Sequence, residues 1–268
     1  MQLGLMEQVL QILPIFLLVL CRITAFFVTS PVFSMQGVPA PFKIGLAFFV
    51  SLITFMAMPF ESSPPFDAAY MLLVVKEVLI GLLYGFTAYL FFTVVQIAGS
   101  LVDTQMGLGI ANVMDPMTGA QSPILGNFKF FIAMLLFLAL NGHHYLLKGI
   151  MESYNFLPIL SDSLFLTIAN GNLSTFLVQA FVSAFYLAFQ LVAPMIVSLF
   201  LVDVALGMLA RTSPQFNIFV IGLPVKIMVG LFLLFVMVPG MGFLFQDLFA
   251  ILFRHLDEMM LMFQQGTG

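Results

Sequence analysis

The chain has 268 residues, of which 62% are apolar and 7% are charged. Soluble domains average about 45–50% apolar and about 25% charged residues, so the composition excludes an ordinary soluble protein and indicates an integral membrane protein. The formal net charge of −4 is spread without a basic run, which argues against a nucleic-acid partner and against a polybasic lipid anchor. The single cysteine, Cys21, excludes an intramolecular disulfide and a cysteine-based metal site.

Apolar runs of spanning or near-spanning length recur along the chain, and they predict an all-α fold with six or more long helices. A helix needs about 20 residues to cross roughly 30 Å of hydrocarbon. The first run has no basic region before it and continues from Val9 to Val28, so it is interpreted as a span and not as a removable signal peptide. The runs fall at about 9–30, 44–60, 68–98, 124–140, 173–210 and 216–238, with a shorter one near 243–253.

Two of these runs are too long for one simple span. The run 68–98 contains the adjacent charges Lys76 and Glu77, and the run 173–210 contains Pro194. Each is either a long tilted helix or a helical hairpin, and only a hairpin keeps both of its ends on one side of the membrane. The sequence leaves both alternatives open.

Small residues recur at helical spacing within these two runs. Gly81 and Gly85 form a GxxxG pattern, and Ala180, Ala184 and Ala188 form a ridge with the same spacing. Such ridges allow helix backbones to approach closely in a membrane. They predict tight helix packing but leave open whether the partner helix belongs to the same chain.

One pair of segments repeats weakly within the chain. The segment 30–44, with Ser-Pro-x-Phe, Gly-x-Pro and Lys-Ile, is similar to the segment 213–227, which carries the same elements in the same order. A duplicated unit is typical of transporter folds, whereas turn-forming residues also recur by chance. Both interpretations stay open.

Motifs for catalysis, nucleotide binding and metal binding are absent from the sequence. His143 and His144 lack an HExxH pattern, and His255 stands alone. There is no phosphate-binding loop and no nucleophile elbow. We therefore expect no enzymatic activity, no cofactor and no metal site.

Ionisable residues lie in or next to the apolar runs, where a charge is costly unless it is paired or faces a polar cavity. Adjacent helical residues point about 100° apart, so Lys76 and Glu77 are expected to pair with other helices or subunits and not with each other. Two interpretations remain for the whole set: structural pairing, within the chain or across a subunit interface, and lining of a transport path. The set comprises Arg22, Lys76, Glu77, Asp103, Asp203, Arg211 and Lys226.

The segment 106–123 is a turn-forming loop between two of the most apolar runs. Gly107, Gly109 and Gly119 allow positive φ, and Asp115-Pro116 favours a turn. Irregular backbone at membrane depth survives only where protein buries it or where it lines a watery cavity. The methionines of the loop add flexible bulk that fills irregular gaps; they are Met106, Met114 and Met117. Two interpretations follow, a pliable stopper in a pore and an ordinary connector outside the membrane.

Two motifs resemble those of the FliR family of bacterial flagellar export-apparatus proteins and its injectisome relatives. The first is DTQMGLGIAN at 103–112, with Asp115-Pro116 and GAQSP at 119–123. The second is LARTSPQFNIF at 209–219, continuing into GLPVKI at 222–227. The similarity extends over nearly the whole chain, and the Gly-x-Pro-x-Lys-Ile version of the second motif looks more flagellar than injectisome-like.

The resemblance implies a single membrane-embedded export-gate domain over residues 1–268, with a FliP-like part at about 1–190 and a FliQ-like part at about 191–268. Family members form a closed hetero-oligomeric helical complex with FliP and FliQ in the bacterial inner membrane at the flagellar basal body. FlhB wraps the cytoplasmic side of that complex and FlhA lies nearby. The family's helices pair as hairpins that are partly lifted out of the bilayer.

The resemblance also implies roles for residues of both motifs. The loop 106–123 would project into the export channel and seal it while unfolded flagellar proteins pass; its expected residues are Met106, Gly107, Gly109, Asn112, Met114, Asp115, Pro116, Met117, Gly119 and Ser122. The second motif would form a turn between helices and contact other subunits; its expected residues are Arg211, Pro214, Gln215, Asn217 and Lys226.

The leading functional hypothesis is a non-enzymatic gate subunit for flagellar type III protein export. The alternatives are the equivalent injectisome subunit and a secondary transporter for ions or small molecules, which the internal repeat and the scattered charges favour. A membrane-embedded enzyme that uses Asp103, Asp203 or the histidines is the third class. A gate subunit is expected to be unstable alone and to co-purify in a large complex, whereas a transporter works as a monomer or symmetric dimer.

Overall fold

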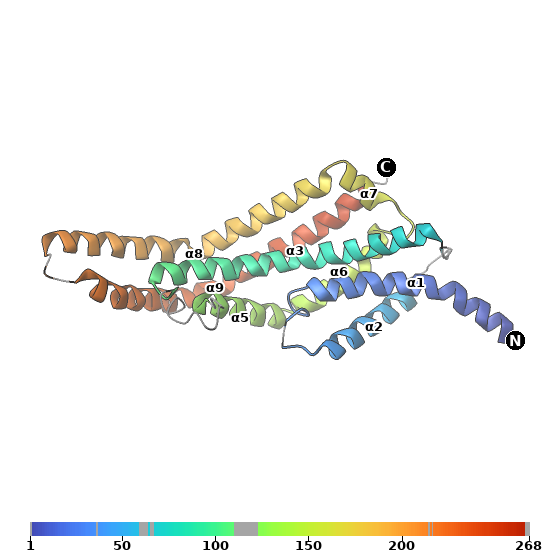
Figure 1. Cartoon of the computed structure of the whole chain (residues 1–268), viewed down its shortest axis with the longest axis horizontal. Helices are drawn as coiled ribbons and strands as arrows, with labels where there is room; N and C mark the ends of the chain where they lie inside the picture. The colour runs from blue at the N-terminus through green and yellow to red at the C-terminus, as the bar shows by residue number, and fades with distance from the viewer. Residues whose placement is uncertain are drawn as a thin grey trace. The chain divides into compact units, whose positions relative to one another are not determined.

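The computed structural model describes residues 2–35, 37–58, 64, 67–109, 123–213, 215 and 217–265. This part of the chain contains no β-strand, and the predicted all-α fold is confirmed. The helices, shown in Figure 1, are α1 (Gln2–Thr29), α2 (Ala40–Ala57), α3 (Ala68–Met106), α5 (Ile124–Ala139), α6 (Gly142–Phe156), α7 (Ser163–Ala169), α8 (Asn172–Thr212) and α9 (Ile218–Gln265).

The longest apolar runs form single helices. The two runs that allowed a helix or a hairpin are one helix each, α3 with 39 residues and α8 with 41. The runs 216–238 and 243–253, expected as separate segments, are joined in α9, whose 48 residues include Pro224 and Pro239. At about 1.5 Å per residue these helices are roughly 60–70 Å long, about twice the thickness of the hydrocarbon core. Each of them is therefore longer than a single perpendicular span requires.

The apolar length of the helices agrees with an integral membrane protein. Among the described residues, five helices are long and apolar enough to cross a membrane, or six if the bent pair α5 and α6 forms one span. The upper of these two counts equals the six helical segments expected from the apolar runs.

The chain divides into two compact units, and each is discontinuous in sequence. Unit 1 comprises Met1–Leu90, Asn141–Ala180 and Leu252–Gly268, and unit 2 comprises Phe91–Leu140 and Phe181–Ile251. The long helices α3, α8 and α9 contribute residues to both units. The division into FliP-like and FliQ-like parts near residue 190 stays a prediction.

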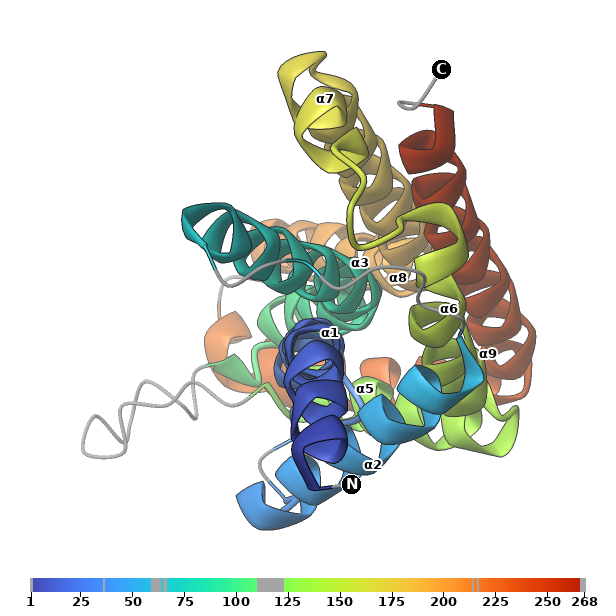
Figure 2. The same ribbon diagram turned by 90° about the vertical axis from the view of Figure 1, so that its right-hand side faces the viewer.

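In unit 1, α1 runs beside α2 and packs closely against the first half of α3 (Figures 1 and 2). The GxxxG pattern of α3 makes the second contact possible. A Cβ atom at Gly81 would collide with the carbonyl oxygen of Arg22, and one at Gly85 would collide with the hydroxyl of Thr29. The partner of this small-residue ridge is therefore a helix of the same chain.

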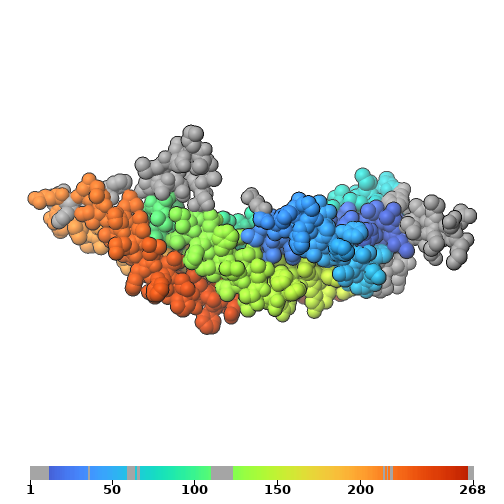
Figure 3. Space-filling view, turned by 90° about the horizontal axis from the view of Figure 1, so that it is seen from below, coloured from blue at the N-terminus to red at the C-terminus, as the bar shows by residue number. Residues whose placement is uncertain are grey.

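Aromatic rings form the core of unit 2. Phe92 of α3, Phe137 of α5 and Phe249 of α9 meet with ring centroids 5.0–5.8 Å apart, and α5 and the start of α9 lie side by side on the surface in Figure 3. The backbones of α3 and α5 approach closely, since a Cβ atom at Gly99 would collide with the Cα atom of Gly126.

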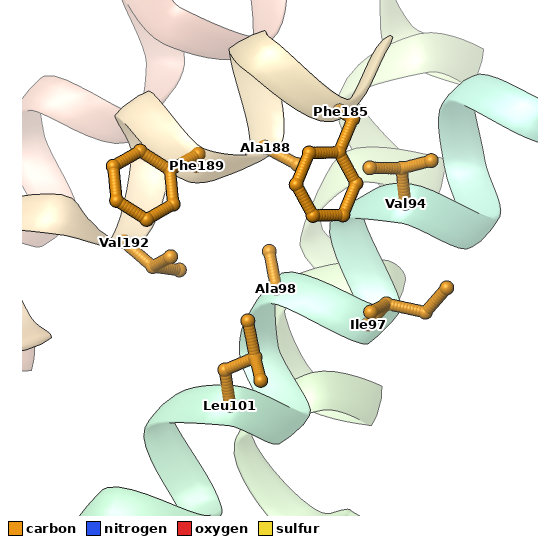
Figure 4. A pocket seen from close by; sticks show the side chains of 8 residues that line it. All are labelled: Val94, Ile97, Ala98, Leu101, Phe185, Ala188, Phe189 and Val192. Carbon is orange, nitrogen blue, oxygen red and sulfur yellow. The ribbon is translucent and has the colours of Figure 1, made fainter. Parts of the chain in front are cut away.

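Helix α8 packs on α3 within unit 2 through small residues. Ala184 and Ala188 are almost fully buried. A shallow apolar hollow remains between the two helices, lined by Ala98 and Leu101 on one side and by Phe189 on the other (Figure 4). The hollow has no charged lining residue.

Candidate functional site

The first motif includes the loop between α3 and α5. The structure describes the two stems of this loop, which are residues 103–109 at the end of α3 and residues 123–126 at the start of α5. Of the residues expected to form the seal, Met106, Gly107 and Gly109 are described. The others lie outside the described residues; they are Asn112, Met114, Asp115, Pro116, Met117, Gly119 and Ser122. The site is therefore built from residues 103–109 and 123–126.

Asp103 ties the two stems of the loop together. Its carboxylate, nearly buried in the last turn of α3, accepts hydrogen bonds from the backbone N–H groups of Leu125 at 3.0 Å and Gly126 at 3.2 Å. The first N–H groups of a helix have no intrahelical partner, and the helix dipole favours a negative charge there. Pro123, which precedes α5, makes no side-chain cap, so a residue from another helix caps α5 and closes the base of the loop.

The end of α3 is held against α9 by close packing. Met106 is fully buried, and a Cβ atom at Gly230 would collide with its side chain. Gly107 has a φ of 81°, and a Cβ atom there would lie 2.9 Å from Leu223. Gly109 has no such φ, and an added Cβ would meet open space. Position 107 therefore favours glycine for two reasons: its φ is positive, and a larger residue would crowd Leu223.

A polar group connects the two motifs. Asp203 of α8 forms an ion pair with Lys226 of α9, with 2.8 Å between Nζ and Oδ1. Gln105, next to Met106 on α3, donates a hydrogen bond from Nε2 to Oδ2 of the same carboxylate at 3.0 Å. Asp203 therefore joins the end of α3, the second half of α8 and the start of α9, and Lys226 is paired within the chain.

The remaining residues of the second motif lie at the connector between α8 and α9. Arg211 is exposed in the last turn of α8, and Gln215 and Asn217 are exposed in the connector. Within the described part of the chain Arg211 has no ion-pair partner. Pro214 lies outside the described residues.

The charges of unit 1 form a separate, fully buried cluster centred on Arg22. Its guanidinium group donates to both carboxylate oxygens of Glu77, at 2.6 and 3.0 Å, and to the hydroxyl of Ser153 at 2.8 Å. It also donates to the carbonyl oxygen of Leu157 and stacks 3.9 Å from the ring centroid of Tyr154. Two parallel bonds to one carboxylate are the strongest geometry available to arginine.

Lys76 closes the turn that follows α6. Its ammonium group donates to the carbonyl oxygens of Pro158, Ile159 and Ser161. It also lies 3.7 Å from Oε1 of Glu77, so the expectation that these neighbours do not pair is only partly right. Because the cluster is engaged inside the chain, its geometry favours structural pairing over a transport path.

Sequence reasoning missed Lys129 as a buried charge. Lys129 of α5 is 1% exposed, and its Nζ lies 3.7 Å from the sulfur of Met195 on α8. Two residues earlier, the side chain of Asn127 accepts a hydrogen bond from Gln96 of α3 at 2.8 Å. The only signal in the sequence is a lysine one turn inside an apolar run, which also fits a residue at a membrane surface.

The histidines do not assemble a metal site. The rings of His143 and His144 lie with centroids 4.1 Å apart at an interplanar angle of 35°, and His255 lies beside Phe176. Over the ranges that the structure describes, no three His, Cys, Asp or Glu side chains come together as metal ligands.

Comparison with known proteins relates the chain to bacterial export proteins. Residues 13–252 match the family described as "Bacterial export proteins, family 1". The chain is 45% identical over 246 residues to the flagellar biosynthetic protein FliR of Bacillus subtilis (strain 168), which covers 92% of this chain and 94% of that protein. It is 33% identical over 252 residues to FliR of Escherichia coli (strain K12), covering 94% and 95%. It is also 32% identical over 219 residues to the surface presentation of antigens protein SpaR of Shigella sonnei, covering 79% and 82%.

Proposed function

Because the chain belongs to the FliR family, family 1 of the bacterial export proteins, we propose that it is a core subunit of the flagellar type III protein export gate. In this proposal it assembles with FliP and FliQ in the inner membrane at the flagellar basal body, next to FlhB, FlhA and the basal-body ring. The observation that carries the proposal is the relationship to FliR over 92% of the chain at 45% identity.

The flagellar role is favoured over the injectisome role. The FliR proteins of Bacillus subtilis (strain 168) and Escherichia coli (strain K12) match at 45% and 33% identity over 92% and 94% of the chain, whereas SpaR of Shigella sonnei matches at 32% over 79%. The transporter alternative loses part of its support, because Arg22, Lys76 and Glu77 are engaged with groups of the same chain.

In the proposed mechanism the loop 106–123 seals the channel between export events, so that unfolded flagellar proteins pass while ions and water do not. Three features of its stems support this role. The Asp103 carboxylate holds both stems together, Met106 anchors one of them in the core, and Gly107 supplies the turn that leaves α3. A loop fixed at its base and built of small and flexible residues is suited to yield to a passing chain and then close again.

Deleting residues 110–120 tests the sealing role. The variant is co-expressed with the FliP and FliQ of the same organism, and both the complex yield and the ion permeability of membrane vesicles are measured. We expect the complex to assemble and the vesicles to leak small ions, because Asp103 and α5 are untouched. Vesicles that carry the assembled complex and stay as tight as the wild type would contradict the sealing role, and loss of the complex without leakage would indicate a scaffold role for the loop.

A further inference from the structure

We propose that a phospholipid with an ammonium-bearing headgroup, of the phosphatidylethanolamine class, binds along the interface of α3 and α8 in unit 2. One acyl chain lies in the apolar hollow of Figure 4, and the headgroup contacts the ion pair of Asp203 and Lys226. The inference goes beyond the proposed export function and uses no residue of the loop between α3 and α5.

The hollow has the shape and the lining that one hydrocarbon chain requires. Its floor is made by Ala98 and Ala188, which are almost fully buried, and Ala98 points toward α8 in Figure 4. Larger apolar side chains that are 44–54% exposed border this floor; they are Ile97, Leu101, Phe185 and Phe189. A chain that lies on small residues between larger apolar ones gains dispersion contacts on several sides.

The hollow and the ion pair belong to the same helix interface. On α3, Gln105 follows the lining residue Leu101 by about one turn. On α8, Asp203 follows the lining residue Val192 by about three turns, so both lie on one face of the helix. The hydrogen bond from Gln105 to Asp203, at 3.0 Å, joins the two helices at this end. A lipid that lies along the interface therefore reaches from the hollow to the ion pair.

The ion pair lies where a lipid headgroup is expected. No charged residue occurs on α3 between Glu77 and Asp103 or on α8 before Asp203. On α9 the stretch 227–246, which follows Lys226, is also uncharged. Each of these stretches is long enough to cross the hydrocarbon core, which takes about 20 helical residues. Charges at the ends of such stretches lie at the boundary between hydrocarbon and headgroups.

The ion pair has hydrogen-bonding capacity that the chain itself does not use. Lys226 lies 2.8 Å from Oδ1 and 3.0 Å from Oδ2 of Asp203, and an ammonium group has three donors, so one donor remains. Asp203 and Lys226 are 39% and 19% exposed, so both are accessible. A phosphate accepts from the lysine, and an ethanolamine ammonium group donates to the carboxylate. A choline headgroup carries the same charges but has no N–H donor for Asp203.

The headgroup decides which lipid is selected. Lipid chains are as apolar as the side chains of a membrane helix, so an acyl chain by itself gains little from one apolar surface over another. A charge-assisted hydrogen bond at the boundary, in contrast, distinguishes ethanolamine from choline.

The test compares two phospholipids with identical acyl chains, phosphatidylethanolamine and phosphatidylcholine. The full chain is purified in mild detergent with and without FliP and FliQ, because every residue of the proposed site belongs to this chain. Each lipid is titrated in, and bound lipid is counted by native mass spectrometry. Two variants probe the site: Ala98→Leu fills the hollow, and Asp203→Asn combined with Lys226→Gln removes both charges. The matched control is Ala205→Leu, at an exposed alanine of α8.

We expect the wild type and Ala205→Leu to bind one phosphatidylethanolamine about tenfold more tightly than phosphatidylcholine, which is the factor that one hydrogen bond to a charged group supplies. Ala98→Leu is expected to weaken binding of both lipids about tenfold, and the double variant to remove the preference between them.

Equal affinities of the wild type for the two lipids would overturn the proposal. So would unchanged binding in Ala98→Leu, which would place the lipid elsewhere, and so would the absence of bound lipid, which would mean that protein covers the hollow. If Ala98→Leu does not fold, the comparison of the two lipids on the wild type and the double variant decides. Each of these outcomes leaves the assembly with FliP and FliQ, and hence the proposed function, unaffected.

Discussion

At the scale of single residues, the buried charges Arg22, Lys76 and Glu77 of unit 1 are each engaged by groups of the same chain. An unpaired charge in hydrocarbon costs several kcal/mol, and this cost explains why Arg22 donates to three residues and why Lys76 donates to the backbone carbonyl groups of the turn at 158–161. The sequence predicted that these charges need partners. The sequence did not predict the identity of the partners. Every residue carries a backbone carbonyl group, so the residue types at 158–161 do not show that these carbonyl groups accept hydrogen bonds from Lys76.

Glu77→Gln tests the buried cluster of unit 1. The change leaves the Arg22 guanidinium fully buried opposite a neutral amide, and removal of one partner of a buried pair typically destabilises a protein by about 3–5 kcal/mol. We expect the midpoint of thermal unfolding in detergent to fall by roughly 10 °C. Glu152→Gln is the control, since Glu152 is 51% exposed in a pair with Lys148 and its change is expected to be within about 1 kcal/mol. Equal midpoints for both variants would show that the cluster does not stabilise the fold.

At the scale of elements, the small residues of α3 determine how closely its neighbours approach. The sequence predicted close packing at Gly81 and Gly85 but left the partner open, because a GxxxG pattern is the same for contacts within and between chains. It also left open whether 68–98 and 173–210 are single helices. Proline inside an apolar run is compatible with a break or with a continuous membrane helix, and packing decides between the two.

Gly81→Ala and Gly45→Ala form a matched pair with opposite expected signs. At Gly81 the new methyl group meets the backbone of Arg22, which cannot rotate away, so we expect destabilisation by about 1–3 kcal/mol. At Gly45 on α2 the methyl group meets nothing within 4 Å, so we expect a gain of about 0.5–1 kcal/mol from higher helix propensity. Thermal unfolding in detergent measures both, and a loss of stability at Gly45 equal to that at Gly81 would argue against close packing of α1 on α3.

Asp103→Ala tests the cap that closes the base of the loop. Without the carboxylate, the N–H groups of Leu125 and Gly126 lose their acceptor, and helix caps of this kind are worth about 0.5–2 kcal/mol. We expect amide hydrogen exchange at 125 and 126 to become several-fold to about thirtyfold faster. The control is Asp162→Ala, because Asp162 precedes α7 without a side-chain cap. Unchanged exchange at 125 and 126 would mean that other contacts hold the start of α5.

The candidate site was only partly predictable at this scale. The turn residues of 106–123 identified a loop, and the positive φ of Gly107 agrees with its residue type. The link from Gln105 to Asp203 was not predictable, since the residues are 98 positions apart and neither pattern specifies the other. Lys129 was missed because a lysine near the end of an apolar run fits a surface position equally well.

At the scale of the whole molecule, the distribution of buried residues shows that α8 and α9 leave most of their apolar surface uncovered by the chain itself. In the apolar spans of α8 and α9, 22% and 11% of the residues are buried within the chain, against 61% in α3. Lipid or other subunits must cover the rest, because exposed apolar patches of this extent are unfavourable in water. The helices were predictable from the apolar runs of the sequence. The surfaces that meet lipid could not be distinguished from those that meet other subunits, because both are apolar.

The most direct test of the central claim is the native mass of the chain, purified alone and after co-expression with the FliP and FliQ of the same organism. The account predicts that the chain alone gives low yields and aggregates, and that co-expression yields one large, defined complex containing all three proteins. A stable monomer or homodimer whose mass does not change in the presence of FliP and FliQ would contradict the export-gate assignment.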